Sequence, residues 1–238
     1  MISERIFARG FGSFWRSVMP WSERGVRTIN LALRERFDAP LELTSREDDR
    51  GFLNELAFRI AMVGFGRNLP PSDWGVFEES LQIAVNKMAH FVHEGLLPVS
   101  EPGKNEAILL ARRLHSQLLF HSRHSNLVFS PFFNGCGFVD ACEGDILSGA
   151  TLIEVKSGVR AFGSPDIRQL LTYCALARAG GGPAIDSVSL INPRQGVSFD
   201  ISLDNLSDLL AGCSSTQLLD QIIQFAVSGH PELIDGRL

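Results

Sequence analysis

The segment GDILSGATLIEVKSG, residues 144–158, decides the fold class of this chain. It contains two short apolar runs on either side of a glycine-containing turn, a pattern typical of a β-hairpin. Side chains alternate between the two faces of a strand, so Glu154 and Lys156 share one face of the second run. A carboxylate and an ammonium group therefore lie together on an otherwise apolar strand.

Asp145 joins the same face in two of three turn geometries. A two-residue turn at 149–150 pairs it directly with Glu154, and one at 148–149 makes the two carboxylates diagonal neighbours. In both registers their Cβ atoms lie roughly 5 to 8 Å apart. A three-residue turn sends Asp145 to the opposite face, because a slip of one residue reverses the direction of every side chain.

Two carboxylates on an apolar hairpin favour a divalent cation. They repel each other, and burial alone would make one of them bind a proton. Oxygen ligands favour Mg²⁺, with Mn²⁺ as a substitute. Lys156 would then stabilise developing negative charge or position an attacking water. Alone, Glu-x-Lys is also typical of a solvated strand face, so the hypothesis depends on Asp145 facing Glu154.

Helical and strand patterns follow each other on both sides of the hairpin. Helices are predicted at 104–121, 164–182 and 215–229, and strands at 126–133, 137–147, 151–158 and, around a turn at 192–196, within 186–203. Ser164 is the expected N-cap of the second helix. The order helix, three strands, helix, strand predicts a mixed α/β core. Gln169 and Tyr173 are four residues apart and share one helical face.

Residues 1–100 have mainly helical patterns. Residues 51–66 carry an apolar stripe at helical spacing, 67–75 break the helix, and a second helix is expected to end near Gly95. We therefore expect a helical region at 1–100 and an α/β domain at 101–238. The first 36 residues hold seven arginines against three glutamates, a pattern that favours a solvated helical face slightly over a nucleic-acid contact.

Composition limits the remaining possibilities. Hydrophobic residues make up 45% and charged residues 21%, as in globular proteins. No apolar run approaches the roughly 20 residues of a membrane span, so we expect a cytoplasmic protein without a membrane partner. The net charge of −5 requires any nucleic-acid contact to be locally basic. Four scattered cysteines indicate reduced thiols and give no support for an iron-sulfur cluster.

Asp145, Glu154 and Lys156, followed by Gln169-Leu-Leu-Thr-Tyr173, resemble the PD-(D/E)xK nuclease superfamily, and the QxxxY element resembles its RecB-like branch. The resemblance covers about residues 101–195 and implies a restriction-endonuclease-like mixed sheet flanked by helices. Gly144 stands where the family name has proline. The cysteines that bind the cluster in iron-sulfur members are not recognisable.

The resemblance assigns roles to the motif residues. It implies that Asp145, Glu154 and the backbone carbonyl of Val155 bind the metal and that Lys156 is the catalytic lysine. Gln169 and Tyr173 would support the site or contact the nucleic-acid backbone.

Four further residues have two readings each. Arg160 and Arg168 are equally consistent with phosphate binding and with a surface ion pair to neighbours such as Asp166. Glu106 and His115 occupy the preceding helix, where the family often supplies another ligand. We favour a first-turn acid for Glu106 and a surface or packing role for His115.

The sequence thus predicts a Mg²⁺-dependent nuclease, with DNA favoured over RNA as the substrate but neither excluded. The resemblance points to a prokaryotic setting such as repair or antiviral defence. One alternative is a catalytically inactive nuclease-fold subunit that binds nucleic acid or assembles with other proteins. Another is an enzyme that acts only with a helicase or ATPase partner docked on the Arg-rich segment.

Overall fold

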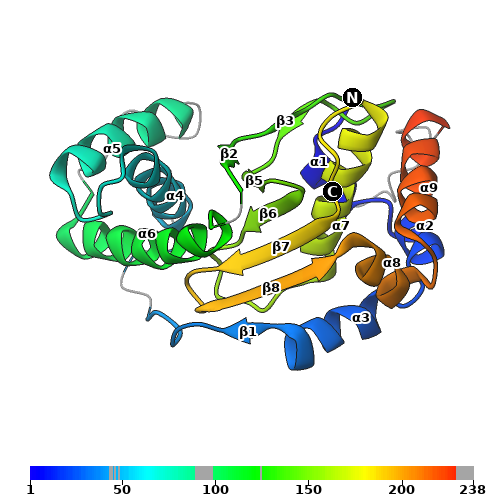
Figure 1. Cartoon of the computed structure of the whole chain (residues 1–238), viewed down its shortest axis with the longest axis horizontal. Helices are drawn as coiled ribbons and strands as arrows, with labels where there is room; N and C mark the ends of the chain where they lie inside the picture. The colour runs from blue at the N-terminus through cyan, green and yellow to red at the C-terminus, as the bar shows by residue number, and fades with distance from the viewer. Residues whose placement is uncertain (43–44, 46, 48, 89–98, 124, 229–238) are drawn as a thin grey trace.

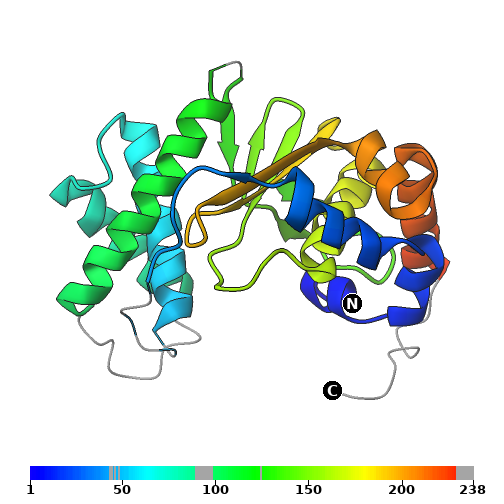
Figure 2. The ribbon, with the colours of Figure 1, turned by 90° about the horizontal axis from the view of Figure 1, so that it is seen from below.

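The protein is built around a six-stranded mixed sheet with the strand order β1-β8-β7-β6-β5-β2. The computed structural model describes residues 1–42, 45, 47, 49–88, 99–123 and 125–228. Helices cover both faces of the sheet (Figures 1 and 2). Among the paired strands of the described chain, only β6 and β7 run parallel, and helix α7 connects them. The α/β class expected from the sequence is confirmed.

The elements have these bounds. The main sheet contains β1 (Glu35–Arg36), β2 (Leu127–Phe129), β5 (Ile146–Ser148), β6 (Thr151–Val155), β7 (Ser187–Asn192) and β8 (Val197–Ser202), and β3 (Phe132–Phe133) pairs with β4 (Cys142–Glu143). The helices are α1 (Glu4–Arg9), α2 (Gly12–Val18), α3 (Ser22–Thr28), a π-helical turn η1 (Ile29–Leu33), α4 (Arg50–Arg67), α5 (Trp74–Met88), α6 (Glu101–His121), α7 (Ser164–Ala179), α8 (Leu203–Ala211) and α9 (Ser215–Ser228).

The β5–β6 hairpin adopts the register that brings the two carboxylates face to face. Ile146 pairs with Ile153 and Ser148 with Thr151, which leaves a two-residue turn at 149–150. Gly149 opens this turn with φ +57°, and a Cβ there would approach Ser125 Oγ to 2.6 Å. Glycine suits the first position of such a hairpin turn because positive φ carries no steric penalty there. The three-residue turn that would separate the carboxylates is therefore excluded.

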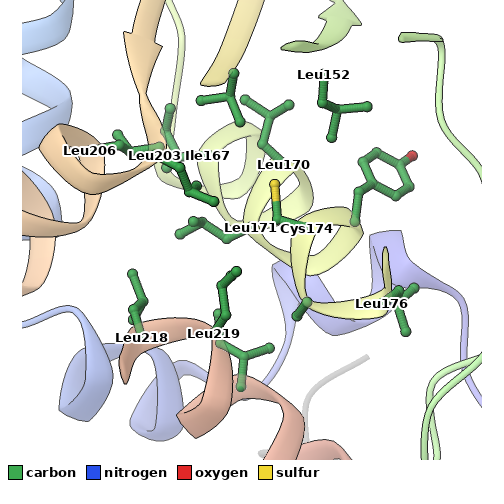
Figure 3. Packing of buried hydrophobic residues seen from close by; sticks show 14 of the residues in the cluster. Leu152, Ile167, Leu170, Leu171, Cys174, Leu176, Leu203, Leu206, Leu218 and Leu219 are labelled. Atoms are coloured by element: carbon green, nitrogen blue, oxygen red, sulfur yellow. The ribbon is translucent and has the colours of Figure 1, made fainter. Parts of the chain in front are cut away.

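The alternation along this hairpin divides the interior into two cores. Ile146 and Ile153 pack with α4, α5 and α6 on one face of the sheet. Leu147 and Leu152 pack on the other face, where leucines of α7 meet α8 and α9 (Figure 3). Asp145 and Glu154 are two residues away from Leu147 and Leu152 along their strands, so they point to the same face, the α7 side of the sheet.

Residues 1–36 belong to the core on the α7 side. Phe7 and Trp15 are fully buried there, and the indole of Trp15 donates to the carbonyl of Phe7 at 3.0 Å. Strand β1 then extends the sheet by pairing with β8. The helix expected at 51–66 is α4. The predicted end of the next helix near Gly95 lies outside the described residues.

Two local predictions are wrong. Ser164 is the first residue of α7 rather than its N-cap; the cap is Gly163, whose N–H donates to Asp166 Oδ2 at 2.8 Å. This bond is the reciprocal half of a capping box, in which the carboxylate of the third helical residue accepts from the N–H of the cap. Helix α8, which directly follows β8, was not expected. The Ser202 side chain accepts from Asn205 N–H at 3.2 Å and starts this helix.

A buried ion pair joins the sheet to the α4–α6 layer. Arg194 donates through Nη1 to Glu106 Oε1 at 2.7 Å and through Nη2 to Asn54 Oδ1 at 3.0 Å. Its Nε donates to the carbonyl of Ser157 at 2.8 Å. The interpretation of Glu106 as a first-turn acid is wrong, because α6 begins at Glu101 and Glu106 lies buried one turn later.

None of the helices in the described ranges is long and apolar enough to cross a membrane. All four cysteines lie in the described part of the chain, and all four are free thiols.

The buried ion pair predicts a large stability difference between two matched variants. Arg194→Met removes one partner of the pair and leaves Glu106 without its guanidinium, so we expect the free energy of unfolding to fall by about 3 to 5 kcal/mol. Arg178→Met breaks an exposed pair with Asp220, and we expect a loss of at most about 1 kcal/mol. Urea unfolding measures both. Equal losses would contradict the structural role assigned to Arg194.

Candidate active site

The centre of the site is the carboxylate pair that the hairpin brings together. Asp145 Oδ2 accepts a hydrogen bond from the backbone N–H of Val155 at 2.7 Å. Glu154 is 2% exposed, and its Oε1 accepts from Lys156 Nζ at 2.8 Å. Its Oε2 is buried and has no hydrogen-bond partner in the described part of the chain. A buried carboxylate oxygen of this kind is stabilised by a proton or a cation.

The pKa values of the two carboxylates also indicate that the pair requires a proton or a cation. Burial and, second, the charge of Asp145 raise the pKa of Glu154 to about 8, although Lys156 opposes both effects. Burial also raises the pKa of Asp145, whereas the hydrogen bond from Val155 lowers it. The two carboxylates therefore resist carrying two negative charges without an additional positive charge.

Lys156 connects the strand to α7. Its Nζ donates to Glu154 Oε1 and, at 2.7 Å, to Gln169 Oε1, and it lies 3.9 Å from Asp166 Oδ1. Gln169 Nε2 in turn donates to the hydroxyl of Tyr173 at 2.8 Å. Gln169 and Tyr173 thus lie together on the buried face of α7, as their four-residue spacing predicted. This chain of hydrogen bonds fixes the lysine beside the carboxylates.

Glu4 completes the hydrogen-bond network from the other end of the sequence. Its Oε1 accepts from Gln169 Nε2 at 3.3 Å and from Tyr173 Oη at 3.4 Å. The side chain is buried although it lies on α1, about 150 residues before the motif. Sequence reasoning missed this residue, since only the tertiary fold brings α1 onto α7.

The two predicted phosphate-binding arginines lie in different places. Arg160 donates to both carboxylate oxygens of Asp166, at 2.7 and 2.8 Å, yet its side chain is 58% exposed and lines the cleft described below. Arg168 places its guanidinium 5.7 Å from the ring of Trp15 and does not line that cleft.

His115 packs against the ring of Phe65 at a centroid distance of 6.1 Å. Burial lowers its pKa. A neutral imidazole against an aromatic ring is the packing arrangement that the sequence favoured for this residue.

A cleft of about 530 Å³ opens over the carboxylate pair. Its walls come from α1, α4, the end of α5 and the segment between β6 and α7. The basic residues that line it are Arg5, Arg9, Arg59, Lys87, Lys156 and Arg160, and the acidic ones are Glu55, Glu143, Asp145, Glu154 and Asp166. The cleft is therefore lined by both cations and carboxylates, among them the buried Glu154 and the half-buried Asp145.

The donor set suits Mg²⁺ with a small number of protein ligands. Within the described ranges no group of three or more His, Cys, Asp or Glu side chains has the spacing of a metal site. Asp145, Glu154 and the carbonyl of Val155 would be the protein ligands, and Mg²⁺ in proteins commonly uses one or two carboxylates and keeps several waters. The orphaned Glu154 Oε2 fits this requirement.

No protein-family model matches the sequence, and no curated protein matches it. The geometry of the site therefore carries the functional argument.

Because the pKa of Glu154 is raised, replacing this carboxylate by a neutral amide should increase the stability of the protein by an amount that depends on pH. The folded-state pKa of about 8 lies above the ordinary 4.5, so in the wild type stability is lost as pH rises between these values. With a chelator present, we expect Glu154→Gln to be more stable to urea than the wild type at pH 9, and the difference to shrink towards pH 4.

Glu143→Gln is the control, because this glutamate lines the same cleft but is 55% exposed. We expect its stability to stay within about 0.5 kcal/mol of the wild type at each pH. A Glu154→Gln variant that is no more stable than the wild type at pH 9 would show that the carboxylate is not strained by its surroundings.

Proposed function

We propose that this protein is a Mg²⁺-dependent nuclease that hydrolyses phosphodiester bonds, with DNA as the favoured substrate. The observation that carries the proposal is the pair formed by the half-buried Asp145 and the buried Glu154, with Glu154 Oε2 unpartnered among the described residues, in a cleft lined by both basic and acidic side chains. The order α6, β2, β5, β6, α7, β7 of the main sheet and its helices supports it, since the resemblance to PD-(D/E)xK nucleases implies helix, three strands, helix, strand; the separate β3–β4 pair lies between β2 and β5 in the chain.

The residues divide into those that bind the ion and those that handle the substrate. Asp145, Glu154 and the carbonyl of Val155 would hold Mg²⁺ or Mn²⁺, which supplies Lewis acidity to the scissile phosphate and lowers the pKa of an attacking water when bound. In hydrolysis, an oxygen of water forms a bond to phosphorus while the bond from phosphorus to a sugar oxygen breaks.

Lys156 is placed to stabilise charge on the phosphate. Two of its three N–H donors are used by Glu154 and Gln169, and one remains for a substrate oxygen. Gln169 and Tyr173 keep the ammonium group in this orientation through their own hydrogen bond. Such outer partners typically contribute 10 to 100-fold to metal affinity or activity.

A second candidate function is a nucleic-acid-binding or assembly subunit without catalysis. It is favoured by the internal pairing of Lys156 with Glu154 and by the absence, among the described residues, of a group of three or more His, Cys, Asp or Glu side chains that could hold a metal ion. Calorimetric titration with Mn²⁺ separates the two functions. Binding that is abolished in Asp145→Asn supports the nuclease, and no binding to the wild type supports the subunit.

The nuclease proposal predicts metal-dependent cleavage by the isolated chain. We expect cleavage of DNA with Mg²⁺ or Mn²⁺ and none with a chelator, measured on linear, circular and single-stranded DNA and on RNA. Asp145→Ala, Glu154→Ala and Lys156→Ala should each lower the rate at least about 100-fold, because each removes a charge from the reacting centre.

Two comparisons make this assay specific. Gln169→Ala should lower the rate about 10 to 100-fold, as expected for a group that acts through Lys156. Glu143→Gln should keep the wild-type rate. Unchanged cleavage in a folded Asp145 or Glu154 variant would remove that residue from the mechanism. Full activity of the isolated chain would also argue against a required helicase or ATPase partner.

A further inference from the structure

Helix α1 forms part of the wall of the candidate active site. Arg5 and Arg9 lie one turn apart on this helix, and both line the cleft that holds Asp145 and Glu154. Residues four apart on a helix project from the same face. Burial is the largest single influence on the pKa of Arg5 and lowers it, but the neighbouring groups, led by Tyr173 and Glu154, together outweigh it and raise the pKa. The field of the carboxylates therefore reaches this guanidinium.

The amino-terminal helix is fixed to the body of the protein. The backbone of Ile2 exchanges hydrogen bonds with Phe138 and Asp140, both at 2.9 Å. Phe7 is fully buried, and the Glu4 carboxylate accepts from the Gln169 side chain. The sequence favoured a solvated helical face for this segment, but one side of α1 is anchored and only the other is free to meet a ligand.

The cations on the other walls of the cleft are largely neutralised. Arg59 donates to Glu55 through both Nε and Nη2 at 2.7 Å, and Lys87 lies 3.8 Å from the same carboxylate. Arg160 is held by both oxygens of Asp166. The positive charge of these groups is compensated by protein carboxylates.

The two arginines of helix α1 are less neutralised by protein carboxylates. Arg5 approaches Glu4 through Nε alone, at 3.5 Å, and its side chain is 70% exposed. Arg9 is exposed and forms no ion pair with any residue that the structure describes. Because the whole chain carries a net charge of −5, attraction for a polyanion has to come from local groups such as these.

We propose that Arg5 and Arg9 bind backbone phosphates of the nucleic-acid substrate, so that the amino-terminal helix is part of the substrate-binding site. The proposal rests on the nuclease function and assigns the substrate contact to two residues outside the motif. Guanidinium groups bind phosphate oxygens through paired N–H donors, and each phosphate contact releases counterions from the nucleic acid.

A matched pair of variants tests this assignment. Arg5→Ala/Arg9→Ala removes the two cleft arginines, and Arg24→Ala/Arg27→Ala removes two exposed arginines of α3 that do not line the cleft. Both variants lose the same net charge, so any long-range charge effect is equal. Fluorescence anisotropy with labelled DNA, in a chelator and at several salt concentrations, measures affinity. Cleavage with Mg²⁺ measures KM and kcat separately.

We expect the α1 variant to bind at least about tenfold more weakly at low salt. The slope of log affinity against log salt should fall by about 1.4 for single-stranded DNA or about 1.8 for duplex, the loss expected for two phosphate contacts. KM should rise more than kcat falls. The α3 variant should bind within about twofold of the wild type. Arg5→Lys/Arg9→Lys should recover part of the affinity, which a folding defect would not explain.

The experiment distinguishes failure of the α1 assignment from failure of the proposed nuclease function. If the wild type cleaves DNA with Mg²⁺ but the α1 and α3 variants have the same affinity and KM, the role of α1 is overturned and the nuclease function stands. If the wild type neither binds nor cleaves DNA or RNA with either metal ion, the nuclease function fails and this assignment fails with it.

Discussion

The structure depends on one unfavourable interaction, the burial of Glu154 beside Asp145. Two carboxylates that face each other across the β5–β6 hairpin repel, and Glu154 is almost completely removed from water. The protein offsets this cost only in part, since Lys156 pairs with one oxygen of Glu154 and the other has no hydrogen-bond partner among the described residues. Strongly perturbed carboxylates of this kind cluster at functional sites. We propose a divalent cation as the ligand, because its charge and its preference for oxygen match the pair.

The rest of the fold holds this pair in place. The turn at Gly149 sets the register, and the two isoleucines of the hairpin lock the strands onto α4 and α6. On the opposite face, α7 supplies Gln169 to orient Lys156. Behind the site, Arg194 binds the carbonyl of Ser157 and so restrains the backbone that follows the lysine. Helix α1 adds Glu4 to the same polar network, so residues 165 positions apart in the sequence meet around one small site.

The sequence predicted the features that depend on the local periodicity of side chains. Alternation along β6 placed Glu154 and Lys156 on one face, the glycine-containing turn limited the register to a few choices, and the four-residue spacing placed Gln169 and Tyr173 on one side of α7. It could not predict contacts that join distant segments. Glu4 meets Gln169 across 165 residues, and Arg194 meets Glu106 across 88, and neither pair leaves a local pattern. Arg168 illustrates the same limit, because it lies next to the motif in sequence but points to Trp15.

The central claim is that Asp145 and Glu154 together bind one divalent cation, and a crystal structure with Mn²⁺ tests it most directly. The anomalous scattering of Mn²⁺ locates the ion without reference to any assumed ligand. We predict one peak between the two carboxylates, in contact with Glu154 Oε2 and the carbonyl of Val155. An anomalous map with no peak at this position, and with Glu154 still directed only at Lys156, would contradict the metal site and the hydrolytic chemistry built on it.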